Sequence, residues 1–152
     1  MKDPRRPVVR NAARVLLLDP DGRVLLLRGG DPSVPQAGSW WITPGGGLEP
    51  GEDARAAAIR EVREETGHAL AGLGEPVLRR SSVFPFDGRL LDQRELYFVA
   101  RVPAFTPDST GWTELERRQL HEQRWWTLDE LRTTTETVYP ETLAELVEAA
   151  LG

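Results

Sequence analysis

A run of three glycines followed by an acidic helix constrains this chain more than any other feature of its sequence. Residues 45–47 are all glycine, and residues 52–66 are mostly helix formers. Alanine and valine recur every four residues in the second run, which predicts one apolar stripe along a helix. Gly67 stands where a helix commonly ends. The segment is therefore expected to fold as a close-packed turn that leads into an amphipathic helix.

Three glutamates gather on the predicted helix at a place where their charges are unfavourable. Glu61, Glu64 and Glu65 stand at positions i, i+3 and i+4, so they share one helix face and their carboxylates can converge. Like charges at this spacing repel, and the last two turns of a helix favour cations because the carbonyl end of the helix dipole is negative. Arg60 and Arg63 can offset part of that cost. The remainder indicates a missing positive charge, and clustered carboxylate oxygens suit Mg²⁺ or Mn²⁺.

Each half of this pattern also has an ordinary structural explanation. Most glutamate-rich helix surfaces are solvated charged faces, and a glycine run is equally expected in a tight turn. Glycine does, however, let backbone approach closely, which a carbonyl ligand or a bound phosphate requires. The helix and the glycine run are therefore more informative together than either is alone.

Composition limits the classes of protein to which the chain can belong. With 152 residues it is expected to form a single domain, residues 1–152, with a core of its own. It has no cysteine, which excludes disulfides, thiolate zinc sites and cysteine nucleophiles. Its formal net charge of -5 argues against binding of polymeric nucleic acid, which requires a basic surface. No apolar run resembles a signal peptide or a membrane span, so a cytoplasmic protein without membrane contact is expected.

Apolar runs with strand character alternate with a few helical segments. Residues 19–22, Asp-Pro-Asp-Gly, separate two of these runs and are typical of a hairpin turn. Thr127 is a suitable N-cap for a short helical turn. The expected strands cover residues 10–18, 23–28, 40–43, 76–84, 94–102 and 124–127, the expected helices cover residues 52–66, 128–132 and 140–151, and residues 112–122 are ambiguous. This order predicts an α/β or α+β sandwich with a mixed sheet.

The five tryptophans could offer faces on which a nucleobase stacks, but core packing is the more common role of an indole. Neighbouring residues of a strand point to opposite faces of the sheet. One of Trp40 and Trp41, and one of Trp125 and Trp126, is therefore expected inside the protein whatever the other does.

The stretch from residue 46 to residue 68 resembles the Nudix box. That box is written G-x5-E-x7-R-E-U-x-E-E-x-G-U, where U is an aliphatic residue. This sequence supplies the box residues at the required spacing: Gly46, Glu52, Arg60, Glu61, Val62, Glu64, Glu65 and Gly67. Only the last position departs, because His68 stands where the box has an aliphatic residue. His68 lies beyond the predicted end of the helix, so the departure concerns local packing more than chemistry.

The resemblance implies a Nudix-type α/β/α sandwich in which a mixed sheet lies between helices. It also implies hydrolysis of nucleoside diphosphate derivatives with Mg²⁺ or Mn²⁺ as the cofactor. Glu61 and Glu65 would be the main metal ligands, and Glu64 would be a further ligand or would act through water. The Gly45 carbonyl would supply an additional oxygen.

The resemblance further suggests residues that orient the ligands and one that takes a proton. Arg60 and Glu52 would orient the ligands, because a guanidinium holds carboxylates in place through paired hydrogen bonds. In members of the family the base is either a box glutamate or a glutamate from a late loop. Among the late candidates we prefer Glu116 to Glu114 and Glu122.

Taken together, these residues predict a pyrophosphatase in which water attacks phosphorus in a small nucleoside diphosphate derivative. The alternative is a Nudix-like module that binds such a compound as a sensor without cutting it. Sensor modules usually lose box glutamates, whereas this chain keeps all of them. A homodimer is compatible with the sequence, and neither the particular substrate nor the preferred metal follows from it.

Overall fold

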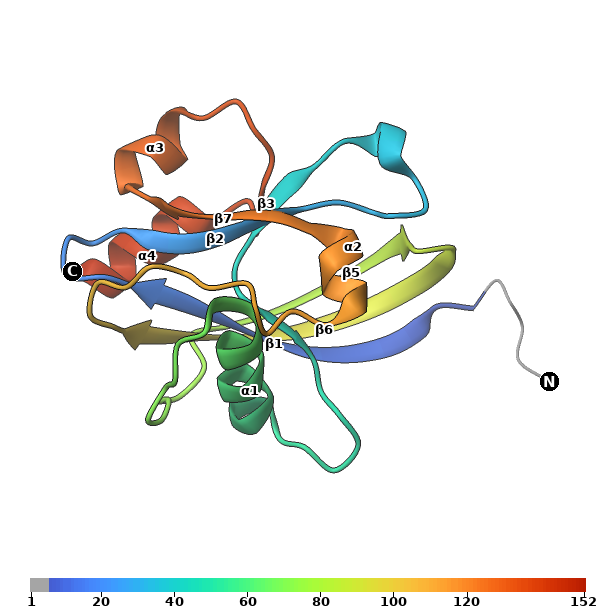
Figure 1. Cartoon of the computed structure of the whole chain (residues 1–152), viewed down its shortest axis with the longest axis horizontal. Coiled ribbons are helices and arrows are strands. Elements are labelled where there is room, and N and C mark those ends of the chain that lie inside the picture. The colour runs from blue at the N-terminus through green and yellow to red at the C-terminus, as the bar shows by residue number, and fades with distance from the viewer. Residues whose placement is uncertain (1–5) are drawn as a thin grey trace.

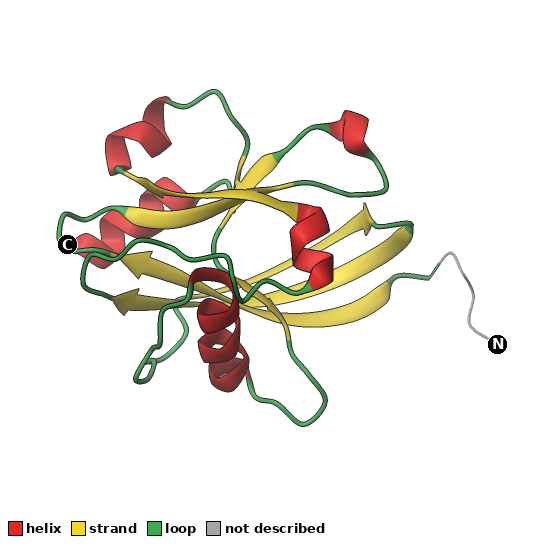
Figure 2. Cartoon of the chain, in the orientation of Figure 1, coloured by secondary structure: helices red, strands yellow, loops and turns green. Residues whose placement is uncertain are grey.

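The computed structural model describes residues 6–152 as a curled, mixed β-sheet flanked by helices (Figure 1, Figure 2). The strands are β1 (Val8–Leu18), β2 (Val24–Gly29), β3 (Trp40–Ile42), β4 (Gly45–Gly47), β5 (Leu78–Phe86), β6 (Arg89–Arg101), β7 (Leu120–Trp126) and β8 (Val138–Tyr139). The helices are α1 (Ala54–Thr66), α2 (Glu114–Gln119), α3 (Leu128–Thr133) and α4 (Leu143–Leu151), and η1 (Pro35–Ala37) is a short 3-10 helix. This arrangement confirms the predicted fold class.

The sheet consists of two halves that meet at the first hairpin. Its strand order is β5-β6-β1-β2-β3-β8, with β4 paired to β1 and β7 paired to β2. β1 runs parallel to β6 along its whole length, whereas β1 and β2 are in register only at Leu18 and Val24, beside the turn. The two halves therefore diverge away from that turn, as Figure 1 shows, and both contribute residues to one cleft.

Hydrophobic clusters lie on both faces of β1, because its alternate residues point in opposite directions. Val15 and Leu17 pack with residues of α1, while Leu16 and Leu18 pack with residues of α4. All four side chains are fully buried. At about 1.5–3 kcal/mol for each fully buried aliphatic side chain, this burial fixes β1 between the two helices.

Local signals position the predicted helices. The Asp53 side chain accepts a hydrogen bond from the N–H of Ala56 and caps α1. Gly67 ends α1 with a φ of 81°, and its N–H donates to the Arg63 carbonyl, as predicted for the helix stop. Thr127 caps α3, also as predicted.

Other boundaries differ from the sequence-based expectation. β6 begins at Arg89 instead of residue 94, because Asp87 and Gly88 have positive φ angles of 49° and 78° and form a tight hairpin turn that was not anticipated. Residues 112–122, which were ambiguous, contain α2 and the start of β7. The last helix begins at Leu143 instead of residue 140, because the Leu143 N–H bonds to the Pro140 carbonyl in a preceding turn. Within residues 6–152 no helix has the length and apolarity to span a bilayer.

Candidate active site

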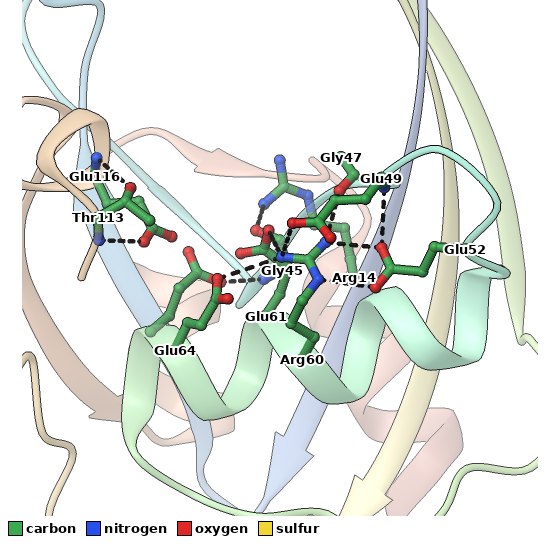
Figure 3. Close-up of polar contacts among 11 residues, drawn as sticks. Arg14, Gly45, Gly47, Glu49, Glu52, Arg60, Glu61, Glu64, Thr113 and Glu116 are labelled. Carbon is green, nitrogen blue, oxygen red and sulfur yellow. Dashed lines mark hydrogen bonds and ion pairs between the residues drawn. The ribbon is translucent and has the colours of Figure 1, made fainter. Parts of the chain in front are cut away.

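A cleft of about 1170 Å³ opens between the two halves of the sheet. The glycine strand β4 and the acidic face of α1 form one part of its wall, where the box residues gather (Figure 3). The facing residues of β5 and β6 and the aromatic side chains of Trp40 and Tyr139 form another part. The volume is slightly above the usual range for a site that encloses a small molecule.

Three carboxylates meet in this cleft. Glu61, Glu65 and Glu116 each offer an oxygen, and these oxygens lie within 4.8 Å of one another. Glu65 is 3% exposed, while Glu61 and Glu116 are half-buried. The structure thus brings together two acids of the box and the late glutamate that the sequence analysis preferred. It does not bring Glu64 into the group.

Glu116 reaches the cluster because of the way α2 begins. The Thr113 hydroxyl accepts a hydrogen bond from the Glu116 N–H (3.2 Å), and the Glu116 carboxylate accepts one from the Thr113 N–H (2.8 Å; Figure 3). This reciprocal capping box holds the side chain back toward the helix start. The sequence signal for it is Thr-x-x-Glu at residues 113–116.

The cluster is electrostatically unfavourable without a cation. Burial raises the pKa of Glu65 well above its ordinary value, and the charges of Glu61 and Glu116 raise it further against the opposing effect of Arg14. Burial also raises the pKa of Glu61, although the hydrogen bond from Arg60 works in the other direction. Ionising all the acids of the cluster together is therefore unfavourable unless a positive charge lies beside them.

Arg60 connects two glutamates of α1 to the residues that precede this helix. Its guanidinium donates two hydrogen bonds of 2.8 Å to Glu52, one of 2.9 Å to Glu61, one of 3.3 Å to Glu64 and one of 3.1 Å to the Gly47 carbonyl (Figure 3). The bonds from Arg60, with one from the backbone N–H of residue 49, lower the pKa of Glu52 to about 2. Arg60 and Glu52 are thus placed where they can hold Glu61 in orientation, and Glu64 lies with them.

Both polar backbone groups of Gly45 form hydrogen bonds with side chains. Its N–H donates a hydrogen bond of 2.7 Å to Glu65, and its carbonyl accepts one of 3.0 Å from Arg14. A carbonyl oxygen has two lone pairs, so this bond leaves one of them free. The φ of Gly45 is +145°, and a side chain there would place its Cβ 2.1 Å from the carbonyl oxygen of Ala13. Gly45 therefore excludes larger residues, whereas a Cβ on Gly46 would stand 2.8 Å from the Glu61 carboxylate and would displace this acid.

A buried ion pair under the glycine strand was not found from the sequence. Arg14 on β1 is 9% exposed and Glu95 on β6 is 5% exposed, and they are joined by a hydrogen bond of 2.9 Å. Glu95 also accepts a bond of 3.0 Å from Arg80. Burial alone would raise the pKa of Glu95, but Arg14 and Arg80 outweigh it and lower the pKa. The available signal for Arg14 was a charged residue among apolar neighbours in β1, whereas Glu95 follows three polar residues in β6 and had no such signal.

Aromatic side chains line the cleft away from the acids. The rings of Trp40 and Tyr139 meet edge to face with their centroids 6.4 Å apart, and the Arg80 guanidinium lies 5.8 Å from the Tyr139 centroid. Trp40 is half-buried, whereas Trp41 and Trp126 are buried in the core. The expectation of one buried tryptophan in each pair is confirmed.

The remaining candidates lie elsewhere. Glu122 is exposed and pairs with Arg28 at 2.8 Å, and Glu114 is exposed on the first turn of α2. His68, the departure from the box, stacks on Phe105 with ring centroids 4.6 Å apart. Its packing explains how a ring is accommodated at a position where the box has an aliphatic residue.

Comparisons with known proteins agree with this geometry. Residues 8–146 match the family profile described as NUDIX domain. The chain is 34% identical over 109 residues to the uncharacterized Nudix hydrolase YvcI of Bacillus subtilis, an alignment that covers 70% of this chain and 62% of that protein. It is 32% identical over 133 residues to an RNA pyrophosphohydrolase of Sphingopyxis alaskensis, which covers 80% of each. The crystal structure of a MutT protein from Methanosarcina mazei superposes with a TM-score of 0.68 and 22% identity, covering 95% of this chain and 94% of that one.

Proposed function

Because this chain belongs to the Nudix family, we propose that it is a divalent-metal-dependent hydrolase that cleaves the diphosphate bond of a nucleoside diphosphate derivative. The observation that carries the proposal is the convergence of Glu61, Glu65 and Glu116 inside a cleft large enough for such a compound. Relatives named RNA pyrophosphohydrolase and putative 8-oxo-dGTP diphosphatase support the reaction class.

The residues of the cluster fit a divalent cation. The three carboxylates supply hard oxygen donors close together, and burial together with the neighbouring acids raises the pKa values of Glu61 and Glu65, so a cation would favour their charged forms. Glu61 and Glu65 would hold Mg²⁺ or Mn²⁺, and the free lone pair on the Gly45 carbonyl would add a donor, while Glu116 would lie beside the cation without binding it. Such a cation supplies positive charge against the phosphate oxygens and makes water easier to deprotonate.

The other box residues keep the acids in place during the reaction. Arg60, anchored by the two hydrogen bonds that it donates to Glu52, fixes the orientation of Glu61. Glu64 also accepts a hydrogen bond from Arg60 and lies outside the group of three carboxylates, which agrees with a role through a water molecule. Glu116 accepts the proton of the attacking water, because its carboxylate faces the other acids while the capping box fixes its backbone.

The aromatic part of the cleft would receive the nucleoside or the group joined to it. The faces of Trp40 and Tyr139 suit a planar base, since any base offers a π face for stacking. Trp40 lies five residues before Gly45, so at most roughly 16 Å of chain separates them. Both residues line the same cleft, so a base can lie by Trp40 while its diphosphate lies by the acids.

A hydrolysis screen in ¹⁸O-labelled water with Mg²⁺ or Mn²⁺ tests the proposal. The panel comprises nucleoside triphosphates, oxidised nucleotides, ADP-ribose, NADH, dinucleoside polyphosphates and nucleotide sugars. The relatives' names add an RNA with a 5′ triphosphate, although the net charge of -5 favours the small molecules. We expect two phosphate-bearing products with ¹⁸O on one phosphate. Label on a carbon atom, or tight binding without any product, would contradict hydrolysis at phosphorus.

The substitution Glu116→Gln tests the proposed base. It should lower kcat by about 10² to 10⁴, because it removes the proton acceptor and keeps the shape of the side chain. Mn²⁺ affinity, measured by electron paramagnetic resonance, should change little. Glu122→Gln is the matched control, because Glu122 is a nearby exposed acid paired with Arg28, and its kcat should equal that of the wild type. A normal kcat for Glu116→Gln moves the base elsewhere, and a loss of Mn²⁺ binding makes Glu116 a ligand instead.

A further inference from the structure

Arg14 connects the floor of the cleft to the glycine strand. Its Nε donates to Glu95 at 2.9 Å, and its Nη1 donates to the carbonyls of Thr43 and Gly45 at 3.3 and 3.0 Å. Arg14 and Gly45 are also partners in the antiparallel pairing of β1 with β4. The Arg14 guanidinium thus bonds to the carbonyl of the residue with which Arg14 is paired in the sheet (Figure 3).

Glu95 gives Arg14 a fixed orientation. One carboxylate oxygen of Glu95 accepts bonds from Arg14 and Gln93, at 2.9 and 3.2 Å. The other accepts bonds from Arg80 and Tyr97, at 3.0 and 3.3 Å. A buried carboxylate with four donors is fully satisfied and has little freedom to move.

The residue that Arg14 holds is also bonded to the acid cluster. The Gly45 N–H donates a bond of 2.7 Å to Glu65, so the two adjoining peptide groups of Gly45 link the buried guanidinium to the buried carboxylate. Arg14 also contributes a favourable charge interaction with Glu65. A change in the position of Arg14 would therefore be transmitted to Glu65 through a short and rigid chain of contacts.

We propose that Arg14, oriented by Glu95, is a positioning residue that sets the backbone of Gly45 and thereby the Glu65 carboxylate for the metal. This inference rests on the proposed function, because it concerns how the same site is held in shape. A planar guanidinium is required, since one group must reach a carboxylate and two carbonyls in fixed directions. The single nitrogen of a lysine can keep the charge but not all three contacts.

Arg80 provides a matched control for Arg14. Both arginines bond to Glu95 at nearly the same distance, 2.9 and 3.0 Å, so replacing either disturbs one charged hydrogen bond to this carboxylate. The other contacts of Arg80 are with Glu141 and the Tyr139 ring, in the aromatic part of the cleft. Of these two arginines, only Arg14 also donates a hydrogen bond to the Gly45 carbonyl.

The experiment compares Arg14→Lys and Arg80→Met with the wild type in Mn²⁺ titrations without substrate and in steady-state kinetics. Arg14→Lys should weaken Mn²⁺ binding and lower kcat by about 10- to 100-fold each, the usual effect of a residue that orients metal ligands, with a smaller change in KM. Arg80→Met should leave Mn²⁺ affinity within about twofold of the wild type and act on KM, because its other contacts lie away from the acids.

Several outcomes are decisive. Wild-type Mn²⁺ affinity and kcat in folded Arg14→Lys overturn the inference, as does an equal loss of Mn²⁺ affinity in Arg80→Met. If Arg14→Lys does not fold, Glu95→Gln tests the same link from the other end, and normal Mn²⁺ affinity in that variant contradicts the proposal. If the wild type neither binds Mn²⁺ nor hydrolyses any substrate, the proposed function itself fails.

Discussion

The variant Glu65→Gln is expected to lose at least about a thousandfold in kcat while melting no lower than the wild type in the absence of divalent ions. The loss follows because the amide is a poor substitute for a charged metal ligand. The retained stability follows from the site. Glu65 is buried beside Glu61 and Glu116, and the glutamine oxygen can still accept the hydrogen bond from Gly45.

The sign of the stability effect comes from the raised pKa of Glu65. A carboxyl group whose pKa is higher in the folded than in the unfolded protein destabilises the fold as pH rises from its ordinary value of 4.5 through its folded value. At neutral pH the metal-free wild type is therefore destabilised, whether Glu65 is ionised in its buried site or takes up a proton on folding. Glu65→Gln has no such cost, so its melting temperature should equal or exceed that of the wild type.

Metal addition should then reverse the order of the two proteins. Mg²⁺ at a hundred times its dissociation constant stabilises the wild type by about 2.7 kcal/mol through mass action, and Glu65→Gln should gain much less. Melting curves with and without Mg²⁺ measure this contrast. A strong destabilisation of metal-free Glu65→Gln with an equal response of both proteins to Mg²⁺ would mean that Glu65 is a structural partner of the Gly45 peptide and not a ligand.

Short-range features of this chain were readable from its sequence. The stop of α1 at Gly67 and the cap of α3 at Thr127 each depend on one residue whose backbone or side-chain chemistry suits that position. Strand alternation alone predicted that one tryptophan of each pair is buried, and the structure identifies these as Trp41 and Trp126. These features depend on the chain within a few residues, so they do not require knowledge of the rest of the fold.

Features that depend on strand pairing could not be read in the same way. β4 consists only of glycine, a residue with poor strand propensity, and it forms because β1 supplies the pairing partner. Arg14 and Glu95 meet across 81 residues because β1 and β6 are parallel and in a particular register. Glu116 joins the cluster because of the path that the chain takes after β6, which the sequence does not reveal. The Thr-x-x-Glu pattern of its capping box, at residues 113–116, is present in the sequence.

The most direct test of the central claim is turnover of the preferred substrate in excess EDTA, followed by addition of Mg²⁺ or Mn²⁺. The clustered acids Glu61, Glu65 and Glu116 cannot by themselves neutralise a diphosphate, because they carry the same sign of charge as the substrate. We therefore expect no detectable turnover with the chelator and full recovery when the free cation exceeds it. Undiminished turnover in excess EDTA would contradict a divalent-metal mechanism at this site.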